Sequence, residues 1–131
     1  MKLKCAVILL AGMISGQAMA DLQQVCQIVK NATIVSQDSA NTFLGKISSS
    51  YDTNSVFNEY GTYGNQYSGV SMWNNYSKFG NSFDPFSAFN TSSGRPPMII
   101  RDGQVLGYLT LNTVIGNSLS PNALRGCKKK L

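Results

Sequence analysis

Residues 51–90 read YDTNSVFNEYGTYGNQYSGVSMWNNYSKFGNSFDPFSAFN, a stretch rich in tyrosine, asparagine, serine and glycine and poor in charge. Written at a period of sixteen residues and continued to Met98, it aligns in three copies, 51–66, 67–82 and 83–98. The fifth, seventh and eighth columns keep their chemistry: Ser55, Ser71 and Ser87; Phe57, Trp73 and Phe89; Asn58, Asn74 and Asn90. Such a periodicity is typical of units that bury an apolar side against their neighbours. We therefore interpret the stretch as a folded, turn-rich 16-residue repeat region rather than a disordered tract.

Local signals within a copy favour short helical turns. In the first copy Ser55 can accept the free N–H groups of a first turn, and Gly61 can end that turn in the left-handed region. Aromatic residues then recur at steps of three and four residues, which places their rings on one side of a helical or 3₁₀ path. We predict one or two helical turns in each copy, with Phe57, Trp73 and Phe89 as the core column.

A β-hairpin is predicted directly after the periodic stretch, over residues 98–111. Asp102 and Gly103 separate two β-rich runs, 98–101 and 104–111, and both residue types tolerate positive φ at a two-residue turn. A second strand candidate is TFLGKIS, residues 42–48. Because its FLGKIS resembles VLGYLT in the second arm of the hairpin, we expect the two to pair in one sheet.

A helix is predicted near each terminus. Residues 21–31 carry apolar side chains on one helical face, and Asn31 can end that helix. The following residues, 32–41, are interpreted as a connection. Near the other end, Pro121 is suited to the first position of a helix in PNALRGC. The sequence therefore predicts a small α+β domain over residues 21–131.

The first twenty residues, MKLKCAVILLAGMISGQAMA, have the form of a secretory signal peptide. Lys2 and Lys4 precede the apolar stretch, and residues 18–20 fit a small-x-small cleavage site. The apolar stretch is about ten residues long, shorter than the roughly 20 that span a bilayer. We predict cleavage after Ala20, no transmembrane segment thereafter, and export to the periplasm or beyond the cell.

Cys26 and Cys127 are the two cysteines that follow the predicted leader. Two cysteines in a small exported domain predict one disulfide, which would join the first element to the last. Closing a loop of about 100 residues stabilises a domain by up to about 4–5 kcal/mol in the chain-entropy model. The alternative is a pair of free, buried thiols.

Several chemistries are absent from the sequence. It has no histidine, which excludes Ser-His-Asp and Cys-His catalysis and every histidine-ligated metal. It has no phosphate-binding loop or dinucleotide fingerprint either, so we predict no cofactor and no metal. The lysines at 128–130 contribute to the net charge of +5, but no nucleic-acid motif accompanies them, and a nucleic-acid partner is not favoured.

Aromatic and amide side chains of the periodic stretch are the candidate ligand-binding residues. Tyrosine and tryptophan offer a large apolar face with a polar tip, and amides can donate to hydroxyl groups. The candidates are Tyr60, Tyr63, Trp73, Tyr76, Asn58 and Asn74. The asparagines have a second possible use, since Asx side chains hydrogen-bond the backbone of their own turns.

These candidate residues, and the chemistries that are absent, leave three functional hypotheses. The first is a non-enzymatic binding or interaction module whose partner is an envelope glycan or a protein. The second is a carbohydrate-active enzyme that uses Asp52, Asp84 or Glu59, since glycosidases need only two carboxyl groups about 5–10 Å apart. The third is a structural component of the cell envelope.

Two stretches, FLGKISSSYDTNSVFNEYGTYGNQYSGVSMWN and PPMIIRDGQVLGYLTLN, resemble a group of small exported bacterial proteins. That group has tandem Y-G-x-Y-G-x-x-Y-S-x-x-S-x-x-N repeats, followed by a Pro-Pro extended segment and a G-Y-L-T-x-N strand. The resemblance spans about 70 residues, from Phe43 to Asn112, and implies export and a shared architecture but no activity. The chain departs from the pattern at Ser77 and Phe79, where the group has Gly and Tyr, so we expect the second copy to turn differently.

Overall fold

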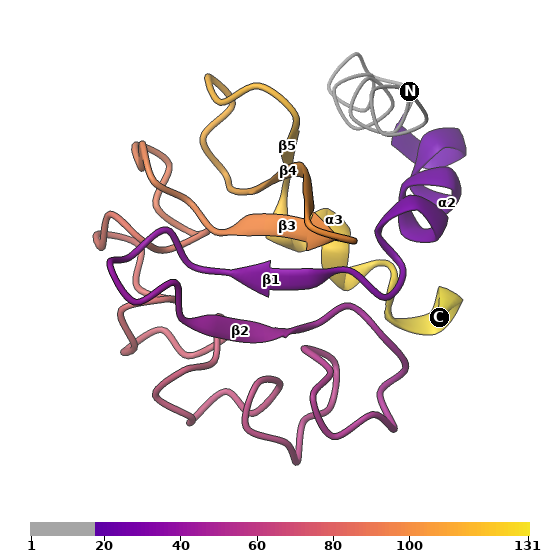
Figure 1. The fold of residues 1–131 in the computed structure, drawn as a ribbon, viewed down its shortest axis with the longest axis horizontal. Coiled ribbons are helices and arrows are strands. Elements are labelled where there is room, and N and C mark those ends of the chain that lie inside the picture. Colours follow the sequence, from indigo (N-terminus) through magenta and orange to yellow (C-terminus); the bar gives the residue numbers. More distant parts are fainter. Residues whose placement is uncertain (1–17) are drawn as a thin grey trace.

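The computed structural model describes residues 18–131; residues 1–17, on which most of the predicted leader falls, lie outside the described residues. The elements in chain order are α2 (Ala18–Val29), β1 (Thr33–Val35), β2 (Phe43–Lys46), β3 (Met98–Arg101), β4 (Gln104–Leu109), β5 (Ser118–Leu119), α3 (Pro121–Arg125) and the 3₁₀ helix η2 (Lys128–Lys130). The strands form one five-stranded sheet in the order β2-β1-β3-β4-β5. The predicted α+β domain, with a hairpin in its sheet and a helix near each end, is confirmed (Figure 1).

The hairpin forms at the turn that the sequence predicts, Asp102–Gly103. β3 and β4 pair antiparallel, with Arg101 opposite Gln104. Asp102 and Gly103 both have positive φ, 54° and 76°, as a two-residue hairpin turn of this kind requires. The second arm ends at Leu109 rather than at residue 111.

The sequence interpretation of residues 32–41 and of the strand pairing was wrong. Thr33–Val35 is not part of a connection: it forms β1, which lies between β2 and β3 and pairs antiparallel with both. Consequently FLGK in β2 pairs with β1 and does not reach VLGYLT in β4. A three-residue strand with Ile34 as its one buried side chain carries too little alternation to be told from a loop.

Residues 49–95, here called the turn segment, form successive three-residue turns instead of the predicted helical turns. Backbone bonds join residues three apart, as from Asn58 N to Ser55 O and from Gly61 N to Asn58 O. The residue that opens a turn also accepts the N–H two positions on: Phe57 N donates to Ser55 Oγ at 3.0 Å and Tyr60 N to Asn58 Oδ1 at 3.0 Å. Ser and Asn side chains recurring every three residues thus compete with the helical hydrogen bonds, and the helix does not propagate.

Equivalent hydrogen bonds recur at positions sixteen residues apart. The bond that Tyr60 N makes to Asn58 is made by Tyr76 N to Asn74 and by Ser92 N to Asn90. The second copy does differ at Ser77, whose hydroxyl accepts the N–H of Phe79 where Gly61 has no side chain. Yet the backbone bond from Asn81 N to Ser77 O matches that from Asn65 N to Gly61 O, so the chain turns at the same place.

Glycine is required in the turn segment because backbones approach closely there. A Cβ at Gly64 would lie 2.1 Å from Asn58 O, and one at Gly80 would lie 2.1 Å from Asn74 O. In β2, Gly45 combines a φ of +123° with contact from the turn segment, since its Cβ would lie 2.6 Å from Val56 Cγ1. These glycines let the turn segment lie directly on itself and on the sheet.

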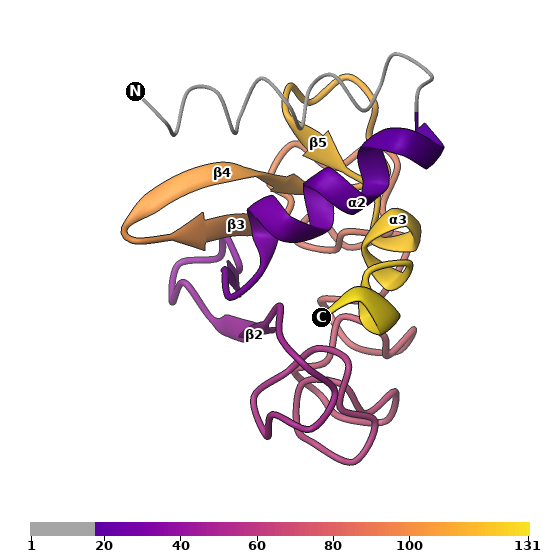
Figure 2. The same ribbon diagram turned by 90° about the vertical axis from the view of Figure 1, so that its right-hand side faces the viewer.

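The turn segment is hydrogen-bonded to the sheet region near both of its ends. Val56 N donates to Lys46 O of β2 at 2.9 Å, and Leu111 N, beyond β4, donates to Ala88 O at 2.9 Å. The segment therefore covers the free edge of β2, which would otherwise present unpaired backbone groups (Figure 2).

A buried carboxylate makes a further tie between the sheet and the turn segment. Asp38, on the β1–β2 connection, accepts hydrogen bonds from Thr42 N at 2.9 Å and Thr42 Oγ1 at 2.7 Å. Lys78 of the turn segment lies 3.5 Å from its Oδ2. Burial acts to raise the pKa of Asp38, but the Thr42 hydrogen bonds and the Lys78 ammonium outweigh it, and the pKa lies below its ordinary value.

The core joins the sheet, both helices and one inner column of the turn segment. The segment contributes Val56, Met72 and Ala88, all almost fully buried and sixteen residues apart. They occupy the column directly before the predicted one. Of the predicted core column Phe57 is buried, whereas Trp73 and Phe89 are partly buried and pack against the core.

The predicted disulfide is present. Cys26 in α2 and Cys127, two residues after α3, are bonded across a sequence separation of 101, and both are fully buried. The bond ties α2 to the chain directly after α3, near the C-terminal end (Figure 2). Within residues 18–131, no helix combines the length and apolar character needed to cross a membrane.

Candidate functional site

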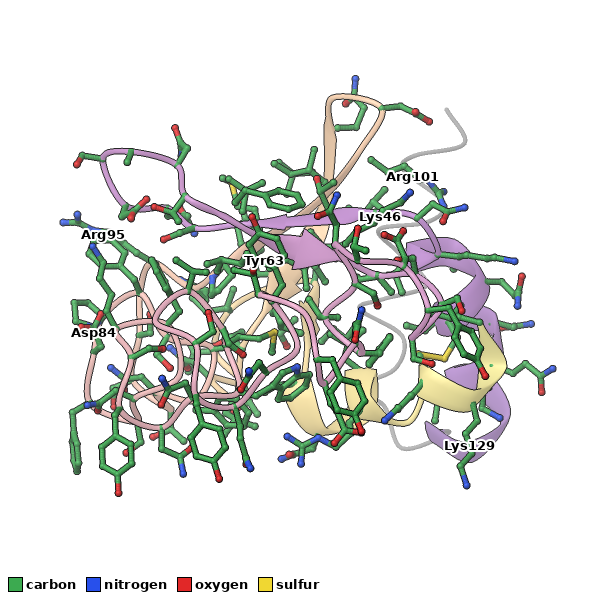
Figure 3. The ribbon with its side chains drawn as sticks, turned by 90° about the horizontal axis from the view of Figure 1, so that it is seen from below. Lys46, Tyr63, Asp84, Arg95, Arg101 and Lys129 are labelled. Carbon is green, nitrogen blue, oxygen red and sulfur yellow. A yellow bond between two sulfur atoms is a disulfide. The ribbon has the colours of Figure 1, made fainter. Side chains whose placement is uncertain are left out.

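Five large aromatic side chains of the turn segment lie almost wholly in solvent. They are Tyr51, Tyr60, Tyr67, Tyr76 and Phe83, between 82% and 99% exposed, and we call them the aromatic row. They occupy two columns of the 16-residue periodicity, one with positions 51, 67 and 83 and the other with 60 and 76. Figure 3 shows aromatic rings projecting from the side of the turn segment that faces away from the strands.

The turn chemistry explains which aromatic residues face outward. Four members of the row follow an asparagine by two residues and donate their backbone N–H to it, as Tyr67 N does to Asn65 Oδ1 at 2.8 Å. Turns opened by the buried Ser55 and Ser71 instead direct Phe57 and Trp73 toward the core. In these turns the residue that opens the turn correlates with the side on which the aromatic ring lies; Tyr51, whose N–H donates to Ser49 Oγ at 3.3 Å, is the exception.

The predicted ligand-binding residues divide into free and structurally engaged groups. Tyr60 and Tyr76 belong to the exposed row. Tyr63 is half-buried and packs edge-to-face on Phe43, with ring centres 4.9 Å apart. The remaining predicted residues, Asn58, Asn74 and Trp73, all make hydrogen bonds within the fold.

Asn58 and Asn74 hold their own turns. The amide of Asn58 donates to Asp52 O at 3.2 Å and accepts from Tyr60 N, and that of Asn74 donates to Ser68 O at 3.0 Å and accepts from Tyr76 N. Of the two uses considered for these side chains, the structure shows the turn-forming one.

Trp73 lies in a groove of about 370 Å³ between the turn segment and the C-terminal elements α3 and η2. Its Nε1 donates to Val56 O at 2.7 Å, which fixes the ring against the segment. The Arg125 guanidinium lies over the ring face, with Cζ 4.4 Å from the ring centre. Tyr67 of the aromatic row also lines the groove.

The groove carries charges of both signs. Lys128 Nζ donates to Glu59 Oε2 at 2.9 Å, which joins η2 to the turn segment. Among residues 18–131, Arg125 makes no ion pair with a carboxylate, and its charge faces only the tryptophan ring. The side chains of Glu59, Lys128 and Arg125 together leave one net positive charge on the groove.

The carboxylates of the enzyme hypothesis have separate local contacts. Asp52 binds Asn54 N at 2.9 Å, Ser48 Oγ at 3.0 Å and Lys46 at 3.7 Å, and these contacts hold its pKa below the ordinary value. A glycosidase acid needs the opposite shift. Asp84 accepts Phe86 N at 2.9 Å, within its own turn. Glu59, the third candidate, is paired with Lys128, so each of these carboxylates is engaged in contacts of its own.

The sequence did not point to three members of the row or to the cationic side of the groove. Tyr51, Tyr67 and Phe83 share an aromatic column that was visible in the alignment, but the alignment does not say which columns face solvent. Nothing near Arg125 in the sequence indicates that it meets Trp73, because the two are 52 positions apart and meet only in the fold.

A scan of protein-family models and searches of curated proteins and solved structures found no match to the chain.

Proposed function

We propose that the protein is an exported, non-enzymatic binding module that holds an envelope glycan through the aromatic row. The observation that carries the proposal is the exposure of five large aromatic side chains in two columns of one segment. Each ring left in water forgoes about 1.5–3 kcal/mol of burial, and exposed apolar groups gathered on one surface mark interaction sites. The remaining aromatic residues of this segment are at least partly buried, so outward placement is selective.

A glycan suits this surface better than a charged partner. Tyrosine side chains present an apolar ring for the flat faces of sugars and a hydroxyl for their polar edges. The row itself contains no charged residue, and it extends over successive turns, as an extended polymer requires. Export is supported by the predicted leader and by the Cys26–Cys127 disulfide, which fits an oxidising compartment such as the periplasm or the exterior.

The test is co-sedimentation of the purified protein with insoluble peptidoglycan and with the native envelope fraction. The variants are Tyr60→Ala and Tyr76→Ala, combined in one chain, because both side chains are free of structural side-chain contacts that their loss would disturb. Val114→Ala is the matched control, since Val114 is an equally exposed apolar residue in the β4–β5 connection.

Retention should fall at least tenfold in the tyrosine double variant, because truncating a ring at the centre of a binding surface costs upwards of about 1–2 kcal/mol. The Val114 variant should bind as the unmodified protein does. Equal retention of all three proteins, each with an unchanged melting temperature, would remove the basis of the proposal.

A further inference from the structure

The groove beside Trp73 has the components of a site for an acidic sugar. Its lining includes Tyr67, a member of the aromatic row that remains mostly exposed. Arg125 of α3 and Lys128 of η2 also line it. Asn65 and Gln66 add amide side chains to the lining. The groove is thus continuous with the row, and it adds the cationic groups that the row lacks.

Arg125 is held in place but retains its capacity for hydrogen bonding. Its Cζ lies 4.4 Å from the centre of the Trp73 ring, and this cation–π contact holds the guanidinium without occupying its N–H groups with an acceptor. Within the part of the chain that the structure describes, no carboxylate lies within ion-pair distance of it. A guanidinium with free edges is the group best matched to a carboxylate, through two parallel hydrogen bonds.

The charge of the groove fits a single carboxylate. Lys128 is already paired with Glu59 at 2.9 Å, so one positive charge, that of Arg125, is left to be neutralised. A phosphate dianion carries a second negative charge that Arg125 alone would not neutralise, and a nucleic-acid strand would bring several more. A volume of about 370 Å³ lies at the small end of the range of ligand sites, which suits one or two sugar rings.

We infer that this groove binds a carboxylate-bearing sugar of the uronic acid type, with Arg125 as the partner of the carboxylate and Tyr67 as the stacking face. The inference rests on the proposed function and specifies the chemistry of one unit of the glycan. The amides of Asn65 and Gln66 border the space that the sugar hydroxyls would occupy. Binding here involves no covalent step.

The protein contains a single tryptophan, so the fluorescence of Trp73 reports on the groove directly. Sodium glucuronate is the probe, titrated at constant ionic strength. Glucose is the matched ring without a carboxylate, and acetate is the carboxylate without a ring. We expect a saturable fluorescence change with glucuronate and at least tenfold weaker responses to the other two. An equal response to glucose, or none to glucuronate, would overturn the inference.

Two variants test the residues, with calorimetry as a second measurement because removal of Arg125 alters the tryptophan signal itself. Arg125→Gln and Tyr67→Ala should each weaken glucuronate binding at least tenfold. Arg95→Gln is the control, because Arg95 also lies over an aromatic ring, that of Phe86 at 5.9 Å, and does not line the groove. Unchanged affinity in Arg125→Gln would refute the assignment.

The two proposals fail in different experiments. Tyr60 and Tyr76 do not line the groove, so their replacement should leave glucuronate affinity unchanged while envelope retention falls. If retention depends on Tyr60 and Tyr76 but glucuronate does not bind, the inference about the groove is wrong and the binding module stands. If glucuronate binds but retention does not depend on these tyrosines, the proposed use of the aromatic row is wrong.

Discussion

Replacement of Gly80 by alanine should destabilise the protein strongly, although the residue belongs to no strand or helix. The added Cβ would lie 2.1 Å from Asn74 O, 2.7 Å from Asn74 C and 2.7 Å from Met72 O, all of them backbone atoms. Backbone cannot rotate away as a side chain does, so the turn around Asn74 must shift by more than an ångström to restore ordinary contact.

That shift acts on hydrogen bonds as well as on packing. Asn74 O accepts both Ser77 N, at 3.0 Å, and Ser77 Oγ, at 3.1 Å. Overpacking costs about 1–3 kcal/mol and each weakened hydrogen bond up to about 1 kcal/mol, so we expect a loss near 3 kcal/mol. In a domain of this size that loss lowers the melting temperature by about 10 °C.

The assay is thermal unfolding followed by circular dichroism, with Gly69→Ala as the matched control. Gly69 lies in the same segment, but a Cβ there would meet nothing within 4 Å. Its replacement should leave the melting temperature unchanged or raise it slightly, because alanine restricts the unfolded chain. Equal melting temperatures for Gly80→Ala and Gly69→Ala would refute the close approach of the backbones.

Three further predictions concern other parts of the fold. Because the pKa of Asp38 is lowered on folding, its charge stabilises the protein above about pH 4, the ordinary value of an aspartate, and that contribution is lost as pH falls through the folded pKa. Asp38→Asn should therefore lower the melting temperature at pH 7 and reduce its fall on acidification; an unchanged pH profile would contradict the assignment. Cys26→Ala combined with Cys127→Ala should reduce the free energy of unfolding by up to about 4–5 kcal/mol in urea titrations, since the bond closes a loop across a separation of 101 residues; a loss below about 1 kcal/mol would show that the bond constrains little. Gly103→Ala should cost about 1–2 kcal/mol, because alanine must take a φ of +76°, whereas Gly103→Asn should cost less; equal unfolding midpoints for the two would contradict the turn geometry.

The elements predicted correctly are those that neighbouring residues determine. The hairpin depends on the two residues Asp102 and Gly103, both of which take positive φ. The start of α3 depends on Ser120, which accepts Asn122 N at 3.1 Å, and on Pro121 in the first turn. These signals involve hydrogen bonds and dihedral angles within about four residues, so the sequence contains all that is needed to recognise them.

The turn segment shows how far such local reasoning extends. The recurrence of serine and asparagine was visible, and serine does accept the N–H groups expected of it. The predicted helical turns do not form a helix, because the same side-chain chemistry is satisfied by a succession of turns with hydrogen bonds between residues three apart. The preference of Ser55 for the first position of a turn is the same whether a helix or a succession of separate turns follows. Which of the two forms depends on what each turn packs against.

The sequence by itself determined the hairpin, the terminal helices, the pairing of Cys26 with Cys127 and the candidacy of the tyrosines. Only the tertiary structure decided that residues 33–35 form an inner strand, that two aromatic columns face solvent, and that Arg125 lies over Trp73. The physical reason is the range of the interactions involved. Capping and turn formation act between near neighbours, whereas burial and the meeting of distant side chains depend on how the whole chain closes on its core.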